Sequence, residues 1–340
     1  MQKYHLYGFG AALVDTEIEV EDGDLQACGI DKGVMTLVDE KRQHELMKQL
    51  ADHLVASHRA SGGSAANTII AASYFGANTF YSCKVSNDDN GQFYLNDMHA
   101  AGVDLAPEVN QQEGITGKCL VMITPDAERT MNTFLGISET VSVKELHQPA
   151  LEQSQYVYIE GYLATSESGR QAAIHLRKWA ETHSVKTSVS LSDPAIVEFF
   201  RNNLQDMIGD RVNLLFCNEA EALAFTNSDT LKQAIEALKD IADEFAITLG
   251  SKGALIYDGQ KCLEIAPCKV DAIDTNGAGD MFAGAFLYAI TNGYDYQQAG
   301  DLASAAAARV VSQFGPRLKP EQHGEILTRV FPDQDRKFQA

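Results

Sequence analysis

One short segment near the C-terminal end of the chain combines small residues with carboxylates. It reads Asp274-Thr275-Asn276-Gly277-Ala278-Gly279-Asp280. Apolar residues recur at helical spacing after Gly279, so the pattern predicts a helix that begins at this turn. The small side chains leave the first amides of that helix uncovered, and such amides bind anions. A carboxylate repels an anion, but Asp280 has a use there if it removes a proton from a hydroxyl that attacks the phosphorus of that anion.

A purely structural reading of Asp280 competes with this one. Acidic side chains favour helix N-termini because they stabilise the helix dipole. For the four residues G-A-G-D alone, the two readings are about equally supported. The full seven-residue string is more specific and favours the catalytic reading.

The chain as a whole carries an excess of acidic residues. It has 340 residues, with 27 Lys and Arg against 47 Asp and Glu, which gives a formal net charge of −20. A nucleic-acid-binding surface needs clustered Lys and Arg, so we expect no nucleic-acid partner. A small nucleotide pocket is compatible with this charge, because backbone amides and a metal ion can hold a phosphate.

Cysteine placement and hydropathy bear on the compartment. The six cysteines are scattered without a C-x-x-C pair, which is typical of reduced thiols in a cytosolic protein. No apolar stretch approaches the length of a membrane span, and the N-terminus lacks the layout of a secretory signal. We therefore expect a cytoplasmic protein with no membrane partner, and its assembly as a monomer or homodimer stays open.

Short apolar runs alternate with longer amphipathic ones, which predicts a mainly parallel sheet covered by helices. The expected strands are His5–Phe9, Asn78–Lys84, Tyr156–Ile159, Lys186–Leu191, Leu214–Cys217, Phe245–Thr248 and Ala254–Tyr257. The expected helices include Ala65–Phe75, Gly91–Ala101, Ser168–Thr182, Glu219–Ala224 and Thr230–Phe245. Two stretches, Ile18–Val38 and Lys118–Thr133, alternate polar and apolar residues and predict a small antiparallel sheet. We expect this sheet to form a lid, made of about residues 16–40 and 110–135, on a single domain spanning 1–340.

The segment that holds Asp280 resembles the D-T-x-G-A-G-D signature of the ribokinase-like (PfkB) family of carbohydrate and nucleoside kinases. Other segments resemble motifs of that family in the same order along the chain, at 11–15, 61–68, 218–221 and 248–253. The resemblance implies a three-layer α/β/α fold with a mainly parallel central sheet and a small β-sheet lid. It also implies ATP-dependent phosphoryl transfer, with Asp280 as the base and Gly277, Ala278 and Gly279 forming the anion site.

The resemblance assigns four residues to the substrate, namely Asp15, Gly62, Gly63 and Asn67. Asp15 follows the first strand, where open α/β sheets bind ligands, and an ionised carboxylate there accepts hydrogen bonds from two ribose hydroxyls. Gly62 and Gly63 let the backbone swing so that the lid excludes water. Asn67 lies in the first turn of the next helix and hydrogen-bonds the sugar. Taken alone, these residues are more typical of turns and a helix cap.

Two further motifs are implied to bind ATP, through Asn218, Glu221, Thr248, Gly250 and Gly253. No G-x-x-x-x-G-K-[ST] phosphate loop occurs in the chain. The resemblance implies that Glu221 acts on Mg²⁺ through a bound water. The alternative for Asn218 and Glu221 is a helix N-terminus with acidic residues in its first turn, and the two readings are compatible.

Three further assignments concern charge and the ring of the acceptor. Arg129 is expected to neutralise charge on the transferring phosphoryl group from the lid, the alternative being a solvent-facing arginine. Tyr162 is expected to stack on a purine, the alternative being a core aromatic. Family members often bind a monovalent cation such as K⁺ beside the anion site. By position, its ligands are the backbone oxygens of Asp274, Asn276, Val310, Gln313 and Gly315.

Within the family, the strings at 35–38, 128–133, 160–163 and 315–317 resemble those of bacterial adenosine kinases. The expected function is therefore ATP-dependent phosphorylation of the 5′-hydroxyl of a ribonucleoside, adenosine to AMP in purine salvage. A PfkB-type sugar kinase acting on ribose, fructose or a related sugar is the main alternative. Gly8-Phe9-Gly10 suggests a nicotinamide-dependent oxidoreductase, but the third glycine of that motif is missing. A third alternative is a non-catalytic nucleoside-binding protein. Such a protein is expected to lack a carboxylate at this position, and Asp280 is present.

Overall fold

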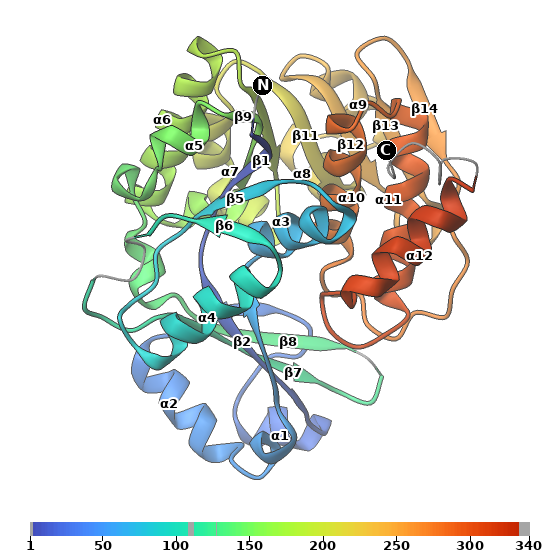
Figure 1. Ribbon diagram of the computed structural model, residues 1–340. Helices are drawn as coiled ribbons and strands as arrows, with labels where there is room; N and C mark the ends of the chain where they lie inside the picture. The colour runs from blue at the N-terminus through green and yellow to red at the C-terminus, as the bar shows by residue number, and fades with distance from the viewer. Residues whose placement is uncertain (1–2, 108–111, 127, 333–340) are drawn as a thin grey trace.

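The computed structural model describes residues 3–107, 112–126 and 128–332, which build two β-sheets with helices around them (Figure 1). The larger sheet runs in the order β14-β13-β12-β11-β10-β9-β1-β5-β6. Neighbouring strands from β6 to β12 are parallel, whereas β13 and β14 are antiparallel. Its strands are β1 (Tyr4–Phe9), β5 (Thr79–Ser82), β6 (Val103–Leu105), β9 (Ser154–Glu160), β10 (Lys186–Ser190), β11 (Val212–Asn218), β12 (Ala242–Thr248), β13 (Ala254–Tyr257) and β14 (Cys262–Ile265). The predicted mainly parallel central sheet is confirmed.

Helices cover both faces of this sheet. Successive strand residues point to opposite faces, and accordingly Leu214 and Phe216 of β11 join one apolar core while Leu215 joins another. The first core is covered by α3 (Ser64–Phe75), α4 (Asp89–Ala100), α10 (Ala278–Thr291), α11 (Tyr296–Val311) and α12 (Pro320–Val330). The second is covered by α5 (Gln148–Leu151), α6 (Glu167–Thr182), α7 (Pro194–Ile208), α8 (Glu219–Thr226) and α9 (Leu231–Leu238). This is the three-layer arrangement that we predicted.

The smaller sheet runs in the order β3-β8-β7-β2-β4. Its strands are β2 (Leu13–Glu19), β3 (Met35–Leu37), β4 (His58–Gly62), β7 (Gly117–Ile123) and β8 (Arg129–Phe134). The prediction of an antiparallel sheet is wrong in part, because β2–β7 and β3–β8 are parallel pairs and only β2–β4 and β7–β8 are antiparallel. Strand β4 was not expected, since its sequence HRASG does not alternate polar and apolar residues.

The stretch Ile18–Val38 is less β-rich than predicted. It contains α1 (Asp22–Ala27), which starts with a capping box between Glu21 and Asp24. This helix and α2 (Glu40–Gln49) pack a small apolar core against one face of the sheet, with Ile18 and Leu120 among its buried residues. The opposite face of the sheet is thereby left for the cavity described below. Figure 1 shows α1 and α2 beside β2 and β7, away from the larger sheet.

One predicted helix is too long. The helix expected over Thr230–Phe245 ends at Leu238 in α9, and strand β12 begins at Ala242. Ile241 and Ala242 follow Leu238 at helical spacing, so the apolar pattern did not mark the boundary. None of the described helices combines the length and the apolarity needed to cross a membrane.

Candidate active site

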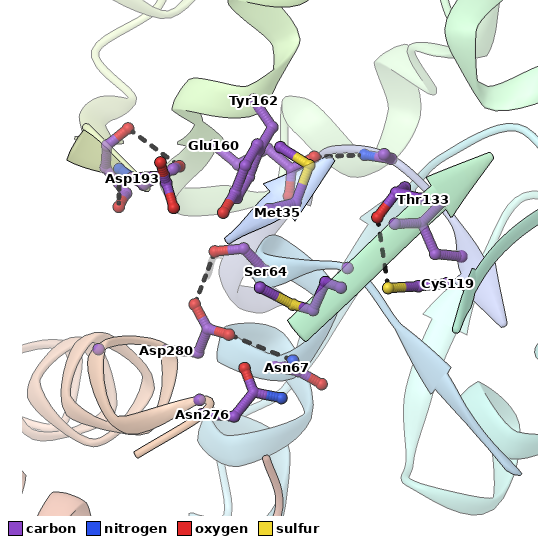
Figure 2. A pocket seen from close by; sticks show the side chains of 18 of the residues that line it. Met35, Ser64, Asn67, Cys119, Thr133, Glu160, Tyr162, Asp193, Asn276 and Asp280 are labelled. Carbon is purple, nitrogen blue, oxygen red and sulfur yellow. Dashed lines mark hydrogen bonds between the residues drawn. The ribbon is translucent and has the colours of Figure 1, made fainter. Parts of the chain in front are cut away.

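A cavity of about 420 Å³ lies where the two sheets meet (Figure 2). The larger sheet presents the carboxyl ends of its parallel strands there, through Glu160, Ser190, Asn218 and Thr248. Ligands of open α/β sheets bind outside this end of the strands. The smaller sheet and the N-terminus of α10 complete the lining.

Asp280 lies in the first turn of α10 and faces the cavity. Its Oδ1 accepts a hydrogen bond from the Oγ of Ser64 at 2.6 Å, and its Oδ2 accepts one from the Nδ2 of Asn67 at 3.2 Å. Figure 2 shows both donors pointing at the carboxylate. Burial raises the pKa of Asp280 to about 6, and the two hydrogen bonds oppose this effect. The carboxylate is therefore ionised at neutral pH with a pKa close to that pH, as a general base requires.

The turn before Asp280 is shaped by two glycines with different functions. Gly277 has φ of +71°, and a Cβ there would lie 2.5 Å from the carbonyl oxygen of Pro316, so only glycine fits. At Gly279, a Cβ would meet nothing within 4 Å. Within the described structure, no carbonyl accepts a hydrogen bond from the amides of Gly279 and Asp280. These amides can therefore bind an anion that enters the cavity.

Asp15 is a buried carboxylate on the cavity side of the smaller sheet, 7% exposed. Burial raises its pKa to about 7, although the nearby Arg317 lowers it. None of the described residues donates a hydrogen bond to the Asp15 carboxylate, so its oxygens are available to hydroxyls of a ligand. A Cβ on Gly62 would lie 2.2 Å from this carboxylate, and Gly63 has φ of +100°. The two glycines thus make room for Asp15 and turn the chain into α3.

The residues expected to bind ATP divide into two groups. Asn218, Glu221 and Thr248 line the cavity at the ends of β11 and β12. Gly250 and Gly253 do not belong to the described lining of the cavity. Both have positive φ, +58° and +94°. A Cβ on Gly253 would lie 2.0 Å from the Ile265 carbonyl oxygen, which gives this glycine a structural reason of its own.

Asn218 and Glu221 form a capping box at the start of α8. Asn218 Oδ1 accepts from the Glu221 amide at 2.8 Å, and Glu221 Oε2 accepts from the Asn218 amide at 3.0 Å. Asn218 and Glu221 therefore do form the helix N-terminus that was the alternative for them, and their binding of ATP and Mg²⁺ stays a prediction. Burial raises the pKa of Glu221 to about 7, and the nearby Asp193 carboxylate raises it further.

The carboxylates of Glu221 and Asp193 fit the way in which proteins bind Mg²⁺ together with a nucleotide. Mg²⁺ is usually held by one or two carboxylates together with phosphates and waters. The described residues contain no cluster of three or more side chains that would hold a metal by themselves. Glu221 and Asp193, both in the cavity lining, are the residues that would hold Mg²⁺, through its waters.

Arg129 does not belong to the described lining of the cavity. It is 8% exposed, and its Nη2 pairs with the carboxylate of Asp274 and, at 3.4 Å, with Glu17. It is therefore neither solvent-facing nor placed beside a phosphoryl group in this conformation. Its role in transfer stays a prediction that requires the side chain to move.

The loops expected to hold a monovalent cation lie side by side. The Asp274 amide donates to the Val311 carbonyl at 3.1 Å, and the Gly315 amide donates to Asp274 Oδ2 at 2.7 Å. The carbonyl of Val310 accepts from the Gln313 amide at 3.2 Å. The cation itself stays a prediction.

Sequence reasoning missed the part that Glu160 plays. This carboxylate, 1% exposed, accepts from the amides of Ala11 at 2.6 Å and Ala65 at 2.7 Å. It therefore fixes the loop that leads to Asp15 and the first turn of α3, which carries Asn67. Burial raises its pKa to about 7. The available signal was an acid that ends an apolar strand.

An apolar wall lines the same cavity as these carboxylates. Tyr162, in the short 3-10 helix Gly161–Thr165, is partly exposed and lines the cavity, as Figure 2 shows. The smaller sheet and its edges add Leu13, Met35, Leu37, Met131 and Leu135. The cavity thus presents carboxylates for hydroxyl groups and an apolar surface for a ring.

Known proteins resemble this chain over nearly its whole length. The adenosine kinase of Schizophyllum commune is 28% identical over 94% of this chain and 98% of its own. A probable sugar kinase from Rhizobium etli superposes with a TM-score of 0.88 at 28% identity, covering 97% of this chain and 99% of its own. The adenosine kinase of Sinorhizobium meliloti superposes with a TM-score of 0.86 at 29% identity, covering 95% and 99%.

The fold and these likenesses define the class of enzyme. The chain is an ATP-dependent phosphotransferase that acts on an alcohol group, and its substrate is a small molecule, a ribonucleoside or a sugar. The family model for pfkB family carbohydrate kinases matches residues 27–323, and the chain belongs to that family. Enzymes of this family use ATP and typically Mg²⁺.

Proposed function

We propose that this enzyme phosphorylates the 5′-hydroxyl of a ribonucleoside, and that adenosine is the acceptor. The observation that carries the proposal is the apolar wall in the cavity that also holds the carboxylates, built from Tyr162, Leu13, Met35, Leu37, Met131 and Leu135. A planar base gains free energy when it buries its faces against such side chains. A sugar alone has no apolar ring to place there.

In the proposed reaction, each cavity residue has one task. Asp15 accepts hydrogen bonds from the ribose hydroxyls and fixes the sugar. Asp280 takes the proton of the 5′-hydroxyl as its oxygen attacks the γ-phosphorus of ATP. The amides of Gly279 and Asp280 stabilise negative charge on the transferring group. Bound Mg²⁺ would neutralise phosphate charge, held on the side of Glu221 and Asp193.

A sugar kinase is the second candidate, favoured by the family description and by the likeness to a probable sugar kinase. The two candidates share Asp15, Asp280 and the anion site. They differ in what occupies the apolar wall. In a sugar kinase, polar side chains are expected around every hydroxyl of the acceptor, because an unpaired hydroxyl is costly to bury.

An ADP-release assay over a panel of acceptors tests the proposal. The panel holds adenosine, guanosine, cytidine, ribose and fructose at equal concentrations with saturating Mg·ATP. Turnover with adenosine and none with ribose or fructose is expected. The reverse preference would replace the nucleoside proposal by the sugar kinase. Failure to turn over any member of the panel would overturn both candidates.

Substitution of Gly279 by alanine is expected to separate activity from stability. The new methyl group has no neighbour within 4 Å and projects into open space at the start of α10. Alanine favours a helix over glycine by about 0.5–1 kcal/mol, so the melting temperature should not fall. The methyl would crowd a phosphate at the Gly279 amide, so kcat/KM for ATP should fall roughly 10-fold or more, as loss of an oxyanion contact does.

The control for this change is Gly324→Ala, since Gly324 also meets nothing within 4 Å and lies on α12. Steady-state kinetics and thermal unfolding of both variants give the comparison. If Gly279→Ala binds and uses ATP normally, the anion site lies elsewhere.

The pH dependence of kcat/KM for the acceptor is expected to report two carboxyls. The pKa of Asp280 is about 6 and that of Asp15 about 7, and both groups must be ionised to act. Activity should therefore rise with pH and level off about one pH unit above the pKa of Asp15. Below about 6, both groups are protonated and the slope of log(kcat/KM) should approach 2. In Asp15→Asn the slope should be 1, and a slope of 1 in both enzymes would contradict the assignment.

A further inference from the structure

Arg317 lies in the loop between α11 and α12 and reaches three elements at once. Its Nε donates to Asn67 Oδ1 at 3.0 Å, its Nη1 to Asp97 Oδ2 at 2.9 Å and its Nη2 to Ser61 Oγ at 2.9 Å. Its side chain is 15% exposed, so the guanidinium is largely withdrawn from water. The planar fork of an arginine suits such a fixed set of acceptors. Arg317 therefore ties α3, α4 and β4 together.

The bond to Asn67 decides which way the amide of that residue is turned. An amide side chain presents an oxygen acceptor at one end and an NH₂ donor at the other. Arg317 can only donate, so the oxygen end of Asn67 faces it. The NH₂ end is thereby aimed at Asp280, whose Oδ2 it contacts at 3.2 Å. If the amide were reversed, its oxygen would face the carboxylate, and two acceptors repel each other.

We propose that Arg317 is a positioning residue for the base, acting through Asn67 to hold the Asp280 carboxylate in the orientation that phosphoryl transfer requires. The inference rests on the proposed function, in which Asp280 takes the proton of the acceptor hydroxyl. Arg317 needs no contact with substrate, since it is outside the described lining of the cavity. A misplacement of about 1 Å can lower a rate by ~10²-fold, so such a role is measurable in kcat.

The positive charge of Arg317 also favours the ionised form of Asp280. The carboxylates of Asp15, Glu160 and Glu221 all feel the charge of Asp280, while the cation of Arg317 lowers its pKa. Removal of Arg317 leaves Asp280 among these acidic groups with less compensation. We therefore expect the pKa of Asp280 to rise and the acidic limb of the rate profile to move to higher pH.

A double-mutant cycle in kcat tests the proposal on the full-length enzyme. Arg317→Ala and Asn67→Ala are each expected to lower kcat roughly 10- to 100-fold with the KM for ATP unchanged. Because both changes act on the same carboxylate, the double variant is expected to lie within about twofold of the slower single variant. Losses that multiply would overturn the proposal, and so would a wild-type kcat in Arg317→Ala.

The matched control is Arg211→Ala. Arg211 precedes β11 and pairs with Asp243 at 3.1 Å, and its side chain is 47% exposed. This variant is expected to keep the wild-type kcat. Arg317→Lys serves if the alanine variant does not fold, because lysine keeps the charge but not the three-way fork. It is expected to lower kcat roughly 10-fold, and full activity in this variant would contradict a positioning role.

A direct titration of Asp280 separates this proposal from the proposed function. ¹³C NMR of carboxyl-labelled aspartate follows the pKa of Asp280, with Asp280→Asn to assign the signal. A higher pKa is expected in Arg317→Ala and the wild-type value in Arg211→Ala, whatever the acceptor is. An unchanged pKa in Arg317→Ala would overturn the role of Arg317. Failure of the wild-type enzyme to phosphorylate any nucleoside would overturn the proposed function and leave this titration interpretable.

Discussion

Replacement of Asp280 by asparagine is expected to lower kcat by ~10²–10⁴-fold, the range that loss of a general base produces. Asparagine has the shape of the carboxylate and can keep both hydrogen bonds, because the Ser64 hydroxyl can accept as well as donate. It cannot take the proton of an attacking hydroxyl. The fold and the affinity for ATP are therefore expected to remain.

Three measurements on Asp280→Asn check this expectation: kcat at saturating substrates, ATP affinity by calorimetry and the melting temperature. Asp301→Asn is the matched control, since Asp301 is an exposed carboxylate on α11 whose Oδ1 accepts from Gln297 at 3.1 Å. It is expected to turn over normally. An Asp280→Asn enzyme as fast as the wild type would show that Asp280 is not the base.

The residues around Asp280 were the most predictable part of the site. Gly277, Gly279 and Asp280 belong to one contiguous string, and the apolar spacing after it marks the start of α10. The backbone conformation at Gly277 and the open space at Gly279 are local properties that a motif can carry. The proposed roles of these residues go beyond their placement and depend on the experiments above.

The supporting contacts were far less predictable because they join distant parts of the chain. Arg317 reaches Asn67 across 250 positions, and Glu160 reaches Ala11 across 149. No spacing rule connects residues so far apart, since the sheet order that brings them together is set by packing. Arg129 illustrates the same limit, because its pairing with Asp274 depends on how the two sheets meet.

The smaller sheet shows how local pattern fails when one face of a strand meets a ligand cavity. One face of β2 carries Asp15 and Glu17, whereas Ile18 on the other face packs in the core formed with α1 and α2. Alternation located β7 and β8, but the stretch predicted over Ile18–Val38 reached only the end of β2, and the pattern gave no information on the parallel pairing or on β4. The connection from β2 to β7 runs through both sheets, so the direction of this pairing depends on how distant elements pack.

Replacement of Asp15 by asparagine is expected to weaken acceptor binding while stabilising the fold. A hydrogen bond to a charged group contributes about 1.5–3 kcal/mol, so loss of the carboxylate should raise the KM for the acceptor by ~10–100-fold. The KM for ATP should be unchanged, because Asp15 belongs to the smaller sheet, whereas Asn218 and Thr248 end strands of the larger sheet. Asp31→Asn, which changes an exposed carboxylate before β3, is the matched control.

The stability of this variant follows from the direction of its pKa shift. Burial raises the pKa of Asp15 from 3.8 to about 7, so the folded protein binds this proton more tightly than the unfolded chain does. Ionisation therefore destabilises the fold, fully above pH 7 and not at all below pH 3.8. At pH 8, Asp15→Asn should melt at least about 2 °C above the wild type, and the difference should vanish near pH 4. A lower melting temperature at pH 8 would mean that the carboxylate supports the fold, and a normal acceptor KM would remove Asp15 from the substrate site.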